Sequence, residues 1–394
     1  MTNQISLSGA SDVRPKLSAL IQDLCPNGVE FKTLGEVCEL KRGSGITESQ
    51  AIEGDIPVIA GGQKPAYYHN QSNREGLNIT VAGSGAYAGY VAFWEQPIFV
   101  SDAFTVSPKD TSLDIKFVYY FLKNIQPQIH NTKKGSGVPH VHPSSISDFE
   151  IPLPPLEIQK KIVECLDKFS ALAAELQAEL QMRRKQYEYY RTHLLTPHSE
   201  SNSAGDSTDD CNWEWKTLGE LCDTFMGEFV HKNKQNPNGQ YPVYNGGTTP
   251  TGYYDDYNAT ANKVIISARG AGAGFVNLVE TNFWAGNSCH VIEIKDPNVL
   301  YWRFLYYFLK NIEDDLIGHQ QKGGGVPAVS KKQIQDIRIA FPSLNEQKRI
   351  VETLDTFDKL TTSLSDGIPA EQAAQQKRYE YYRDLLLTFP RKAV

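Results

Sequence analysis

The sequence contains one unit written twice, and this duplication limits the folds that the chain can adopt. Residues 159–164 (QKKIVE) return as residues 347–352 (QKRIVE), and residues 187–191 (YEYYR) return unchanged as residues 379–383. Further matches precede these boxes, such as residues 135–139 (GSGVP) with residues 323–327 (GGGVP). The repeating unit is about 185 residues long, and we expect each copy to contain a globular domain followed by a helix.

The helical part of the first copy runs from Lys160 to Leu194 and contains neither Gly nor Pro. A 3.5-residue period connects Ile162, Leu166, Phe169, Ala173, Leu176, Leu180, Arg183, Tyr187, Tyr190 and Leu194, all apolar or aromatic except the arginine. Such a period makes a narrow seam on one helix face, which is typical of a coiled coil. At about 1.5 Å per residue the helix would be roughly 50 Å long, more than a compact domain needs. A long core helix of a bundle remains the alternative.

The second copy supplies a partner for this seam, with four more residues between its two boxes. Four extra residues in a heptad pattern shift the seam locally without destroying it. They lie near residues 365–369 (SDGIP). We expect the helix to break there, with Pro369 in the first turn of the restarted helix.

These patterns divide the chain into six segments. We expect a disordered leader (1–15), a first globular domain (16–154), a central spacer helix (155–196), a flexible linker (197–212), a second globular domain (213–342) and a C-terminal spacer helix (343–389). Short β-branched runs bounded by glycines predict strands, and residues 117–125 and 304–312 predict amphipathic helices. Each domain is therefore predicted to be α+β, around a curved, mostly antiparallel sheet.

Composition restricts the classes of function. The net charge of −7 argues against a broad basic surface, although residues 197–212 alone contribute four acids, so a nucleic-acid site would have to be a local cluster. The six cysteines show no CxxC spacing and suggest buried free thiols in a reducing cytosol. Neither a membrane-spanning apolar run nor a signal-peptide pattern is present. We expect a cytoplasmic protein without a membrane partner.

Motifs for catalysis are missing from the sequence. It contains no GxxxxGK[ST] phosphate loop and no Asn/Asp-Pro-Pro-aromatic box of an amino-methyltransferase. The ExK tripeptides at residues 30–32 and 214–216 lack the Pro-Asp dipeptide that a nuclease site has upstream. His140 and His142 correspond to Ala328 and Ser330 in the second copy, which argues against a metal common to both. We expect a binding protein that has no catalytic residue, cofactor or metal of its own.

Loops that differ between the copies are the candidate binding sites, because amide, hydroxyl and basic groups on glycine-rich loops can contact bases and phosphates. The largest set is Lys133, Lys134, Ser136, His140 and His142 in the first copy, with Gln320, Gln321 and Lys322 in the second. Two further sets are Lys41 and Arg42 with Lys232 and Lys234, and Gln63 and Lys64 with Thr248 and Thr249. Arg269 is taken to replace Gly83 and to enter a groove in one half only. The alternative is an ordinary solvated surface.

The helical boxes resemble those of a known family. Residues 152–163 (PLPPLEIQKKIV) and 184–191 (RKQYEYYR), with residues 341–351 (FPSLNEQKRIV) and 377–383 (KRYEYYR), are similar to the specificity subunit of type I restriction–modification systems. The resemblance covers about residues 16–390. It implies a non-catalytic subunit with two target-recognition domains, each reading one part of a split, asymmetric sequence of double-stranded DNA. It also implies two long helices that pair as an antiparallel coiled coil with pseudo-twofold symmetry.

The resemblance also implies partners. Two methyltransferase subunits would bind the chain, restriction subunits would join them, and S-adenosylmethionine, ATP and Mg would belong to those partners. Subunit contacts are expected at the tyrosine boxes, at Tyr187, Tyr189, Arg191, Tyr379, Tyr381 and Arg383. The tetrads 173–176 (AAEL) and 177–180 (QAEL) look like the length-setting repeats of the family's central helix.

Two alternatives lie outside this family. A bivalent adaptor could grip two protein partners through the duplicated scaffold, and salt-dependent binding to duplex DNA would distinguish it from a DNA reader. A self-contained nuclease or methylase is the weaker alternative, because the catalytic boxes are missing.

Overall fold

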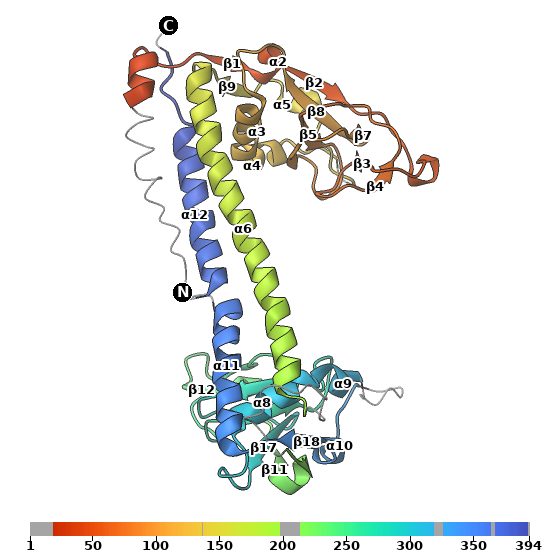
Figure 1. Ribbon diagram of the computed structural model, residues 1–394, viewed down its shortest axis with the longest axis vertical. Helices are drawn as coiled ribbons and strands as arrows, with labels where there is room; N and C mark the ends of the chain where they lie inside the picture. Colours follow the sequence, from red (N-terminus) through yellow and green to blue (C-terminus); the bar gives the residue numbers. More distant parts are fainter. Residues whose placement is uncertain (1–18, 136, 198–212, 319–325, 364–366, 393–394) are drawn as a thin grey trace, which may run out of the picture. The chain divides into compact units, whose positions relative to one another are not determined.

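The computed structural model describes residues 19–135, 137–197, 213–318, 326–363 and 367–392 (Figure 1). The chain divides into two compact units. Unit 1 comprises Met1–Gln177 with Glu371–Val394, and unit 2 comprises Ala178–Ala370. The predicted leader and almost all of the predicted linker lie outside the described residues.

Unit 1 begins with a helical segment at residues 19–24 and has three small sheets. Its elements are β1 (Phe31–Thr33), α2 (Leu34–Val37), β2 (Cys38–Arg42), η1 (Glu48–Gln50), β3 (Ile56–Ile59), β4 (Tyr67–His69), β5 (Asn78–Ala82), β6 (Val91–Trp94), β7 (Phe99–Val100), β8 (Ala103–Pro108), α3 (Ile115–Asn124), α4 (Gln126–Asn131), α5 (Pro143–Ile146) and β9 (Glu150–Pro152). The sheets have the strand orders β2-β8-β5-β6, β4-β3-β7 and β1-β9. Helix α6 (Leu156–Leu194) then begins in unit 1.

Unit 2 repeats this arrangement strand for strand. Its elements are β10 (Glu214–Thr217), α7 (Leu218–Leu221), β11 (Cys222–Met226), η2 (Lys232–Lys234), β12 (Tyr241–Tyr244), β13 (Gly252–Tyr254), β14 (Lys263–Ser267), β15 (Val276–Val279), β16 (Trp284–Ala285), β17 (Cys289–Ile294), α8 (Trp302–Asn311), α9 (Glu313–Gly318), α10 (Lys331–Gln335), β18 (Arg338–Phe341) and α11 (Leu344–Thr362). The sheets are β11-β17-β14-β15, β13-β12-β16 and β10-β18. The duplication therefore extends to the strand topology.

The prediction of one curved sheet in each domain was wrong, although the predicted antiparallel pairing is mostly right. β7 pairs in parallel with β3, whereas β8 pairs in antiparallel fashion with β2 and β5. Only residues 101 and 102 separate β7 from β8, so the chain changes sheets at a sharp corner. Unit 2 has the same parallel exception between β12 and β16. Sequence patterns predict strands but carry no signal for this exchange between sheets.

The buried core of each unit lies between its four-stranded sheet and the predicted amphipathic helix. In unit 1, Phe117 and Leu122 of α3 and Phe104 of β8 are almost completely buried. In unit 2, Phe304 and Leu309 of α8 are equally buried. Residues 117–125 and 304–312 thus contribute to core helices, as predicted.

A buried glutamine fixes each long helix to its globular region. The Gln159 side-chain nitrogen donates to the carbonyl oxygens of Ser112 (3.0 Å) and Pro154 (2.8 Å). The Gln159 side-chain oxygen accepts from the backbone N–H of Asp114 (2.7 Å). Gln347 makes three equivalent bonds in unit 2. Both glutamine side chains are buried, and the backbone carbonyl groups of Pro154 and Pro342 that they satisfy lie in buried bonds, whereas the other four bonds are partly buried.

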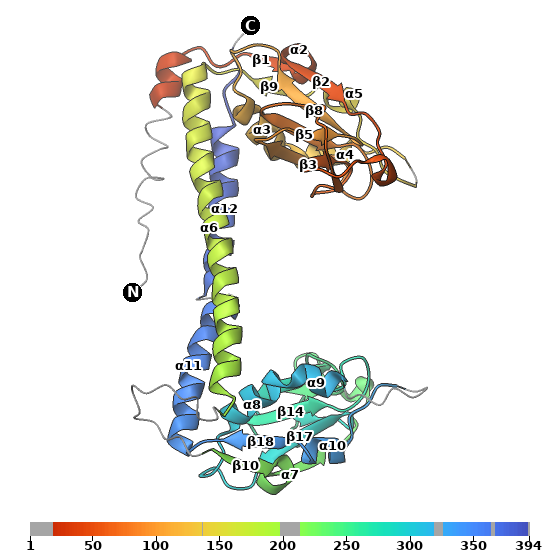
Figure 2. The same ribbon diagram turned by 45° about the vertical axis from the view of Figure 1, so that its right-hand side comes forward.

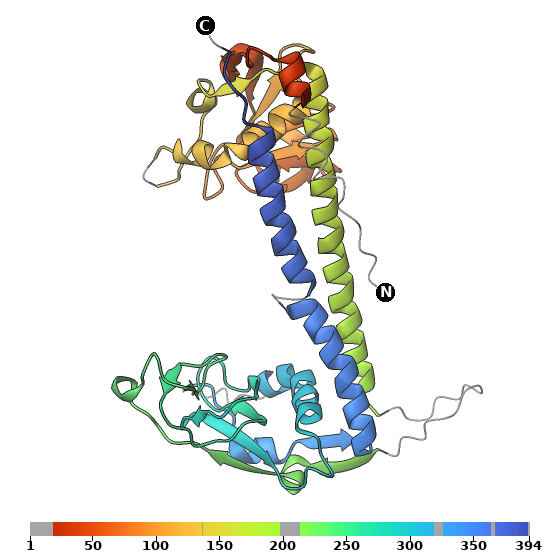
Figure 3. The same ribbon diagram turned by 90° about the vertical axis from the view of Figure 1, so that its left-hand side faces the viewer.

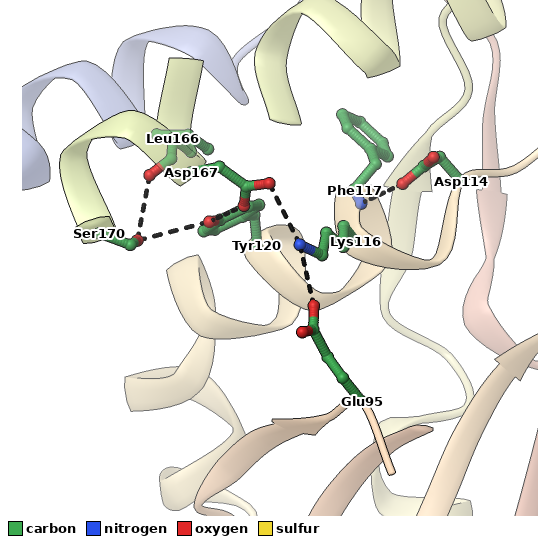
Figure 4. A network of polar contacts seen from close by, with 8 residues as sticks. All are labelled: Glu95, Asp114, Lys116, Phe117, Tyr120, Leu166, Asp167 and Ser170. Atoms are coloured by element: carbon green, nitrogen blue, oxygen red, sulfur yellow. Dashed lines mark hydrogen bonds and ion pairs between the residues drawn. The ribbon is translucent and has the colours of Figure 1, made fainter. Parts of the chain in front are cut away.

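A polar network beside this anchor adds a second attachment (Figure 4). The Tyr120 hydroxyl of α3 donates to the Asp167 carboxylate of α6 at 2.6 Å, and Lys116 pairs with Asp167 (3.2 Å) and Glu95 (3.2 Å). Burial and the bond to Asp167 raise the pKa of Tyr120, so the hydroxyl stays protonated and donates. Asp355 of α11 accepts the corresponding tyrosine hydroxyl in unit 2.

The long helices pair within each unit (Figures 2 and 3). In unit 1, α6 runs antiparallel to α12 (Ile368–Leu386), since Phe169 stacks on Tyr382 (ring centroids 5.4 Å) and Gln372 bonds to Gln177 (3.1 Å). In unit 2, α6 packs on α11, where Phe357 stacks on Tyr190 (5.3 Å). The predicted seam is therefore a pairing surface.

The burial of α6 and the bounds of α11 and α12 can be compared with the predicted seam and the predicted helix break. Most predicted seam positions are buried or half-buried, but Ala173 is exposed. Helix α11 ends at Thr362 and α12 begins at Ile368, so the predicted interruption is present and Pro369 lies in the first turn. Residues 364–366 lie outside the described part.

Residues near the C-terminal end of the described chain return to the start of unit 1. Val29 accepts from the backbone N–H of Lys392 (2.9 Å) and donates to the carbonyl oxygen of Pro390 (2.8 Å). Gly28 has a φ of +88°, and a Cβ atom there would lie 2.5 Å from the Arg391 carbonyl oxygen. Glycine is required because no side chain fits between the two segments.

Two further sequence expectations concern thiols and membranes. The five cysteines in the described ranges are free, and burial raises the pKa of Cys38 and of Cys222 to about 12. The prediction of buried free thiols is confirmed for these two and for Cys165. Among the described residues, no helix has the length and apolar character needed to cross a lipid bilayer.

Candidate functional site

The loop after β5 is the centre of the candidate site in unit 1. Gly85 donates from its backbone N–H to the Pro139 carbonyl oxygen (3.0 Å), and Val141 donates to Gly83 (2.9 Å). These bonds make a short antiparallel bridge in which Ser84 lies opposite His140. Two loops that are far apart in the sequence are thereby joined.

Two more of the predicted loops contact this bridge or its surroundings. A Cβ atom on Gly61 would lie 2.4 Å from the Ser84 carbonyl oxygen, and one on Gly43 would lie 2.4 Å from that of Ser101. Glycine therefore permits close backbone packing at both points. Ser84 also hydrogen-bonds to the Asp102 carboxylate. We call residues 42–45, 61–64, 83–89, 102, 133–135 and 137–142 the loop face of unit 1.

Unit 2 builds the same arrangement. Gly270 donates to Pro327 (3.0 Å), and Arg269 lies opposite Ala328 in the bridge. A Cβ atom on Gly246 would lie 2.2 Å from the Arg269 carbonyl oxygen. We call residues 227–228, 246–249, 268–272 and 326–328 the loop face of unit 2.

The bridge register corrects one sequence alignment. Arg269 is the counterpart of Ser84, and not of Gly83 as the sequence analysis assumed, because Ser84 and Arg269 occupy the same place in the two bridges. The glycine-rich loops contain several small residues in succession, so a shift by one position costs little in a sequence match. Backbone hydrogen bonds fix the register that the sequence leaves open.

The structure separates the predicted residues of unit 1 into three groups. Exposed side chains belong to Lys41, Arg42, Gln63, Lys64 and Lys134. His140 and His142 are half-buried, with their rings stacked at 5.9 Å and an interplanar angle of 6°. Lys133 is half-buried as well, and its ammonium group donates to the Ala86 carbonyl oxygen (3.1 Å). Lys133 therefore holds the central loop, and Ser136 lies outside the described residues.

Lys41 and Arg42 point to opposite sides of β2, because successive side chains alternate along a strand. Arg42 lies on the side of the bridge, where it lines a small depression with Gly83, Asp102 and His142. The depression holds about 10 Å³, far below the few hundred Å³ of a small-molecule site. The depression is therefore too small to hold a small-molecule ligand.

Fewer of the predicted residues of unit 2 can be placed. Thr248, Thr249 and Arg269 are exposed on the loop face. Lys234 is exposed on η2. The segment that follows η2 is bonded to β13, since the backbone N–H of Asn236 donates to the Tyr253 carbonyl oxygen (2.9 Å). Gln320, Gln321, Lys322 and the side chain of Lys232 lie outside the description.

Sequence reasoning missed two residues of the unit 1 face and one beside the unit 2 face. Asp102 places a carboxylate next to Ser84, and Tyr87 exposes 49% of its surface on the central loop. Phe229 exposes 55% of its surface and packs edge-on against His231. Exposed aromatic rings can stack on nucleobases. Their exposure depends on loop conformation, for which the sequence carries no signal.

The six predicted subunit-contact residues fall into an inner and an outer group. Tyr187 packs toward Phe357, and burial raises its pKa to about 12. Tyr379 packs toward Phe169 in unit 1. Arg191 and Arg383 lie over these two tyrosine rings, each at 5.6 Å. By contrast, Tyr189 and Tyr381 expose 63% and 56% of their surface, so they are the two available for a partner.

Comparisons with known proteins agree on one family. The model of the type I restriction modification DNA specificity domain matches residues 26–182 and 211–372. The EcoR124I/EcoR124II specificity subunit of Escherichia coli is 34% identical over 310 residues, which cover 72% of this chain and 72% of that protein. A putative type I restriction enzyme specificity subunit of Haemophilus influenzae is 28% identical and covers 92% of this chain and 96% of its own length. The crystal structure of a type I S subunit from M. genitalium matches with a TM-score of 0.65 and 21% identity, over 91% of this chain and 96% of that chain.

Proposed function

Because this chain belongs to the family of type I restriction–modification DNA specificity subunits, we propose that the loop face of each unit reads one half of a split DNA target. The chain recognises a DNA sequence through its two tandem domains and is not itself a catalyst. One observation carries the proposal. The same loops meet in both units on the same backbone bridge, whereas the side chains on these loops differ.

This combination of constant backbone and variable side chains suits sequence recognition. A fixed scaffold presents its loops to the duplex in the same way in both units, and the side chains determine which base edges are contacted. Exposed cations on the faces, such as Arg42, Lys134 and Arg269, supply phosphate or base contacts. The two different faces give an asymmetric, bipartite target.

Partners bind the helices in this proposal. Tyr189 and Tyr381 occupy equivalent positions in the repeated tyrosine boxes and are both exposed. Two equivalent contact sites fit two methyltransferase subunits, with restriction subunits joining the complex through them. S-adenosylmethionine, ATP and Mg belong to these partners, and the complex acts in the cytoplasm, where the DNA of a bacterial host lies.

Salt-dependent binding of the purified chain to duplex DNA tests the proposal. We expect the logarithm of the association constant to fall with the logarithm of the salt concentration, with a slope of about −0.9 for each phosphate contact. Lys134→Ala should reduce the slope by about one unit, because the side chain is exposed on the loop face. Lys160→Ala removes an exposed lysine from α6 and should leave the slope unchanged. If the chain does not bind duplex DNA, or if Lys134→Ala has the same salt slope as the parent, the bivalent protein adaptor would be favoured.

A further inference from the structure

The bridge that each central loop makes (Ser84 with His140, Arg269 with Ala328) pairs one small residue with one large basic residue, but from opposite strands; in unit 1, His140 also pairs with Lys134 on its other side. In unit 1 the small residue is Ser84 and the large one is His140. In unit 2 the large residue is Arg269 and the small one is Ala328. The two units therefore exchange the side from which the basic group projects.

Bridge geometry explains this exchange. Residues that face each other across an antiparallel pair have Cβ atoms about 4.5–5.5 Å apart and project to the same side. At this spacing the small residue, Ser84 or Ala328, leaves open space beside its large partner. One small and one large residue leave the large one room to extend away from the face.

The backbone beneath Arg269 is held firmly. It is bridged to Ala328 on one side, packed against Gly246 on the other, and turned by Gly270, whose φ is +91°. The Arg269 side chain is exposed. Among the residues that the structure describes, none forms a hydrogen bond or an ion pair with its guanidinium group. A fixed base with an unengaged guanidinium group is the arrangement that a preorganised reader requires.

We propose that this bridge is the base-reading position of each unit, and that Arg269 reads a guanine in the second half of the target. The inference rests on the proposed function. Arginine matches the O6 and N7 acceptors of guanine with two parallel hydrogen bonds from a rigid planar fork in the major groove. A lysine ammonium group is a point charge on a flexible stem and does not fix this geometry. In unit 1, His140 presents a ring nitrogen to the corresponding base pair of the first half.

The first test changes Arg269 in the full-length chain. Arg269→Lys and Arg269→Ala are produced with the methyltransferase subunit, and methylated adenines are mapped across the host DNA. Purified chains are also titrated against duplexes that carry every single substitution in the second half. We expect both variants to lose roughly 10- to 100-fold of discrimination at one G·C pair. Arg269→Lys should keep its affinity for unrelated duplexes, because the positive charge remains.

Arg338→Ala is the matched control, because this exposed arginine of unit 2 lies on β18, a strand that pairs with β10, and its guanidinium group lies over the Trp215 ring. It should leave the target unchanged. If Arg269→Lys keeps the parental target, or weakens binding to all duplexes equally, Arg269 is not a reader and the inference is overturned. Absence of duplex binding by the parent chain would instead overturn the proposed function.

The second test transfers the reader between units. Ser84→Arg with His140→Ala recreates the unit 2 bridge in unit 1, and Asp102→Ser is added so that no carboxylate captures the new arginine. Ser288 occupies the place of Asp102 in unit 2, since Ala268 donates to its carbonyl oxygen (2.8 Å) as Gly83 does to that of Asp102 (3.0 Å). The triple variant should prefer guanine at one position of the first half. A first half that is read as before would count against the bridge as the reading position.

Discussion

The buried glutamines allow the attachment of each helix to be tested one unit at a time. Gln159→Ala removes three hydrogen bonds, one of them in a buried position at the Pro154 carbonyl oxygen and two in partly buried positions at Ser112 and Asp114. At about 1–3 kcal/mol for a buried group left unsatisfied, and with water able to replace the two partly buried bonds, we expect a loss of about 2–3 kcal/mol in unit 1. This is a large part of the 5–15 kcal/mol that stabilises a typical domain.

Hydrogen–deuterium exchange with mass spectrometry reports the effect region by region. Gln159→Ala should speed exchange in the core of unit 1 and leave unit 2 unchanged, and Gln347→Ala should do the opposite. Gln181→Ala removes an exposed glutamine from α6 and serves as the control. Equal exchange in parent and variant, or faster exchange in both units, would refute the view that each glutamine anchors its own unit.

Three further predictions concern a close approach, a buried carboxylate and the helix surface. Gly28→Ala should lower the thermal midpoint by several degrees, because the new methyl group collides with the returning C-terminal segment. Burial, with a smaller effect from Asp355, raises the pKa of Asp358 above its value in the unfolded chain. Ionisation of Asp358 therefore destabilises the folded state as the pH rises from the unfolded pKa through the folded pKa. Asp358→Asn should stabilise unit 2 at pH 7 and not near pH 3, as measured in urea titrations. Tyr189→Ala with Tyr381→Ala should weaken methyltransferase binding at least 10-fold in calorimetry and leave duplex binding intact.

Repetition and periodicity predicted the elements because they reflect burial. The 3.5-residue seam predicted the buried positions of α6, and only Ala173 departed from it among the apolar positions. The break before Pro369 could be predicted from the four extra residues of the second copy. Both features depend on residues that are close together in the sequence, so they could be predicted without knowledge of tertiary contacts.

The composition of the loop faces depends on contacts between distant residues. Lys133 is predicted to contact DNA, and its ammonium group also donates to the carbonyl oxygen of Ala86, 47 residues away, a contact that the sequence does not indicate. The pairing of Ser84 with His140 and of Arg269 with Ala328 follows from bridge register, which no single-sequence pattern encodes. For the same reason Asp102 was missed, since its carboxylate matters only beside Ser84.

The length of α6 provides the last prediction. Leu176 and Leu180 lie four residues apart, both buried in the helix pairing, while the residues between them are exposed. Inserting one further Ala-Ala-Glu-Leu after Leu180 lengthens the helix by about 6 Å and adds about 40° of rotation. The partner helices are already interrupted between Thr362 and Ile368, where an added turn can be absorbed.

If α6 sets the distance between the two readers, the insertion should widen the gap between the two halves of the target. Because B-DNA rises about 3.4 Å per base pair along each strand, an extension of about 6 Å corresponds to one or two base pairs. Methylation mapping of the insertion variant beside the parent measures the gap. Gln177→Ala gives the same Ala-Ala-Glu-Leu tetrad without added length, so its gap should equal that of the parent. A gap that does not change, or halves that are read differently, would show that the helix does not determine this distance.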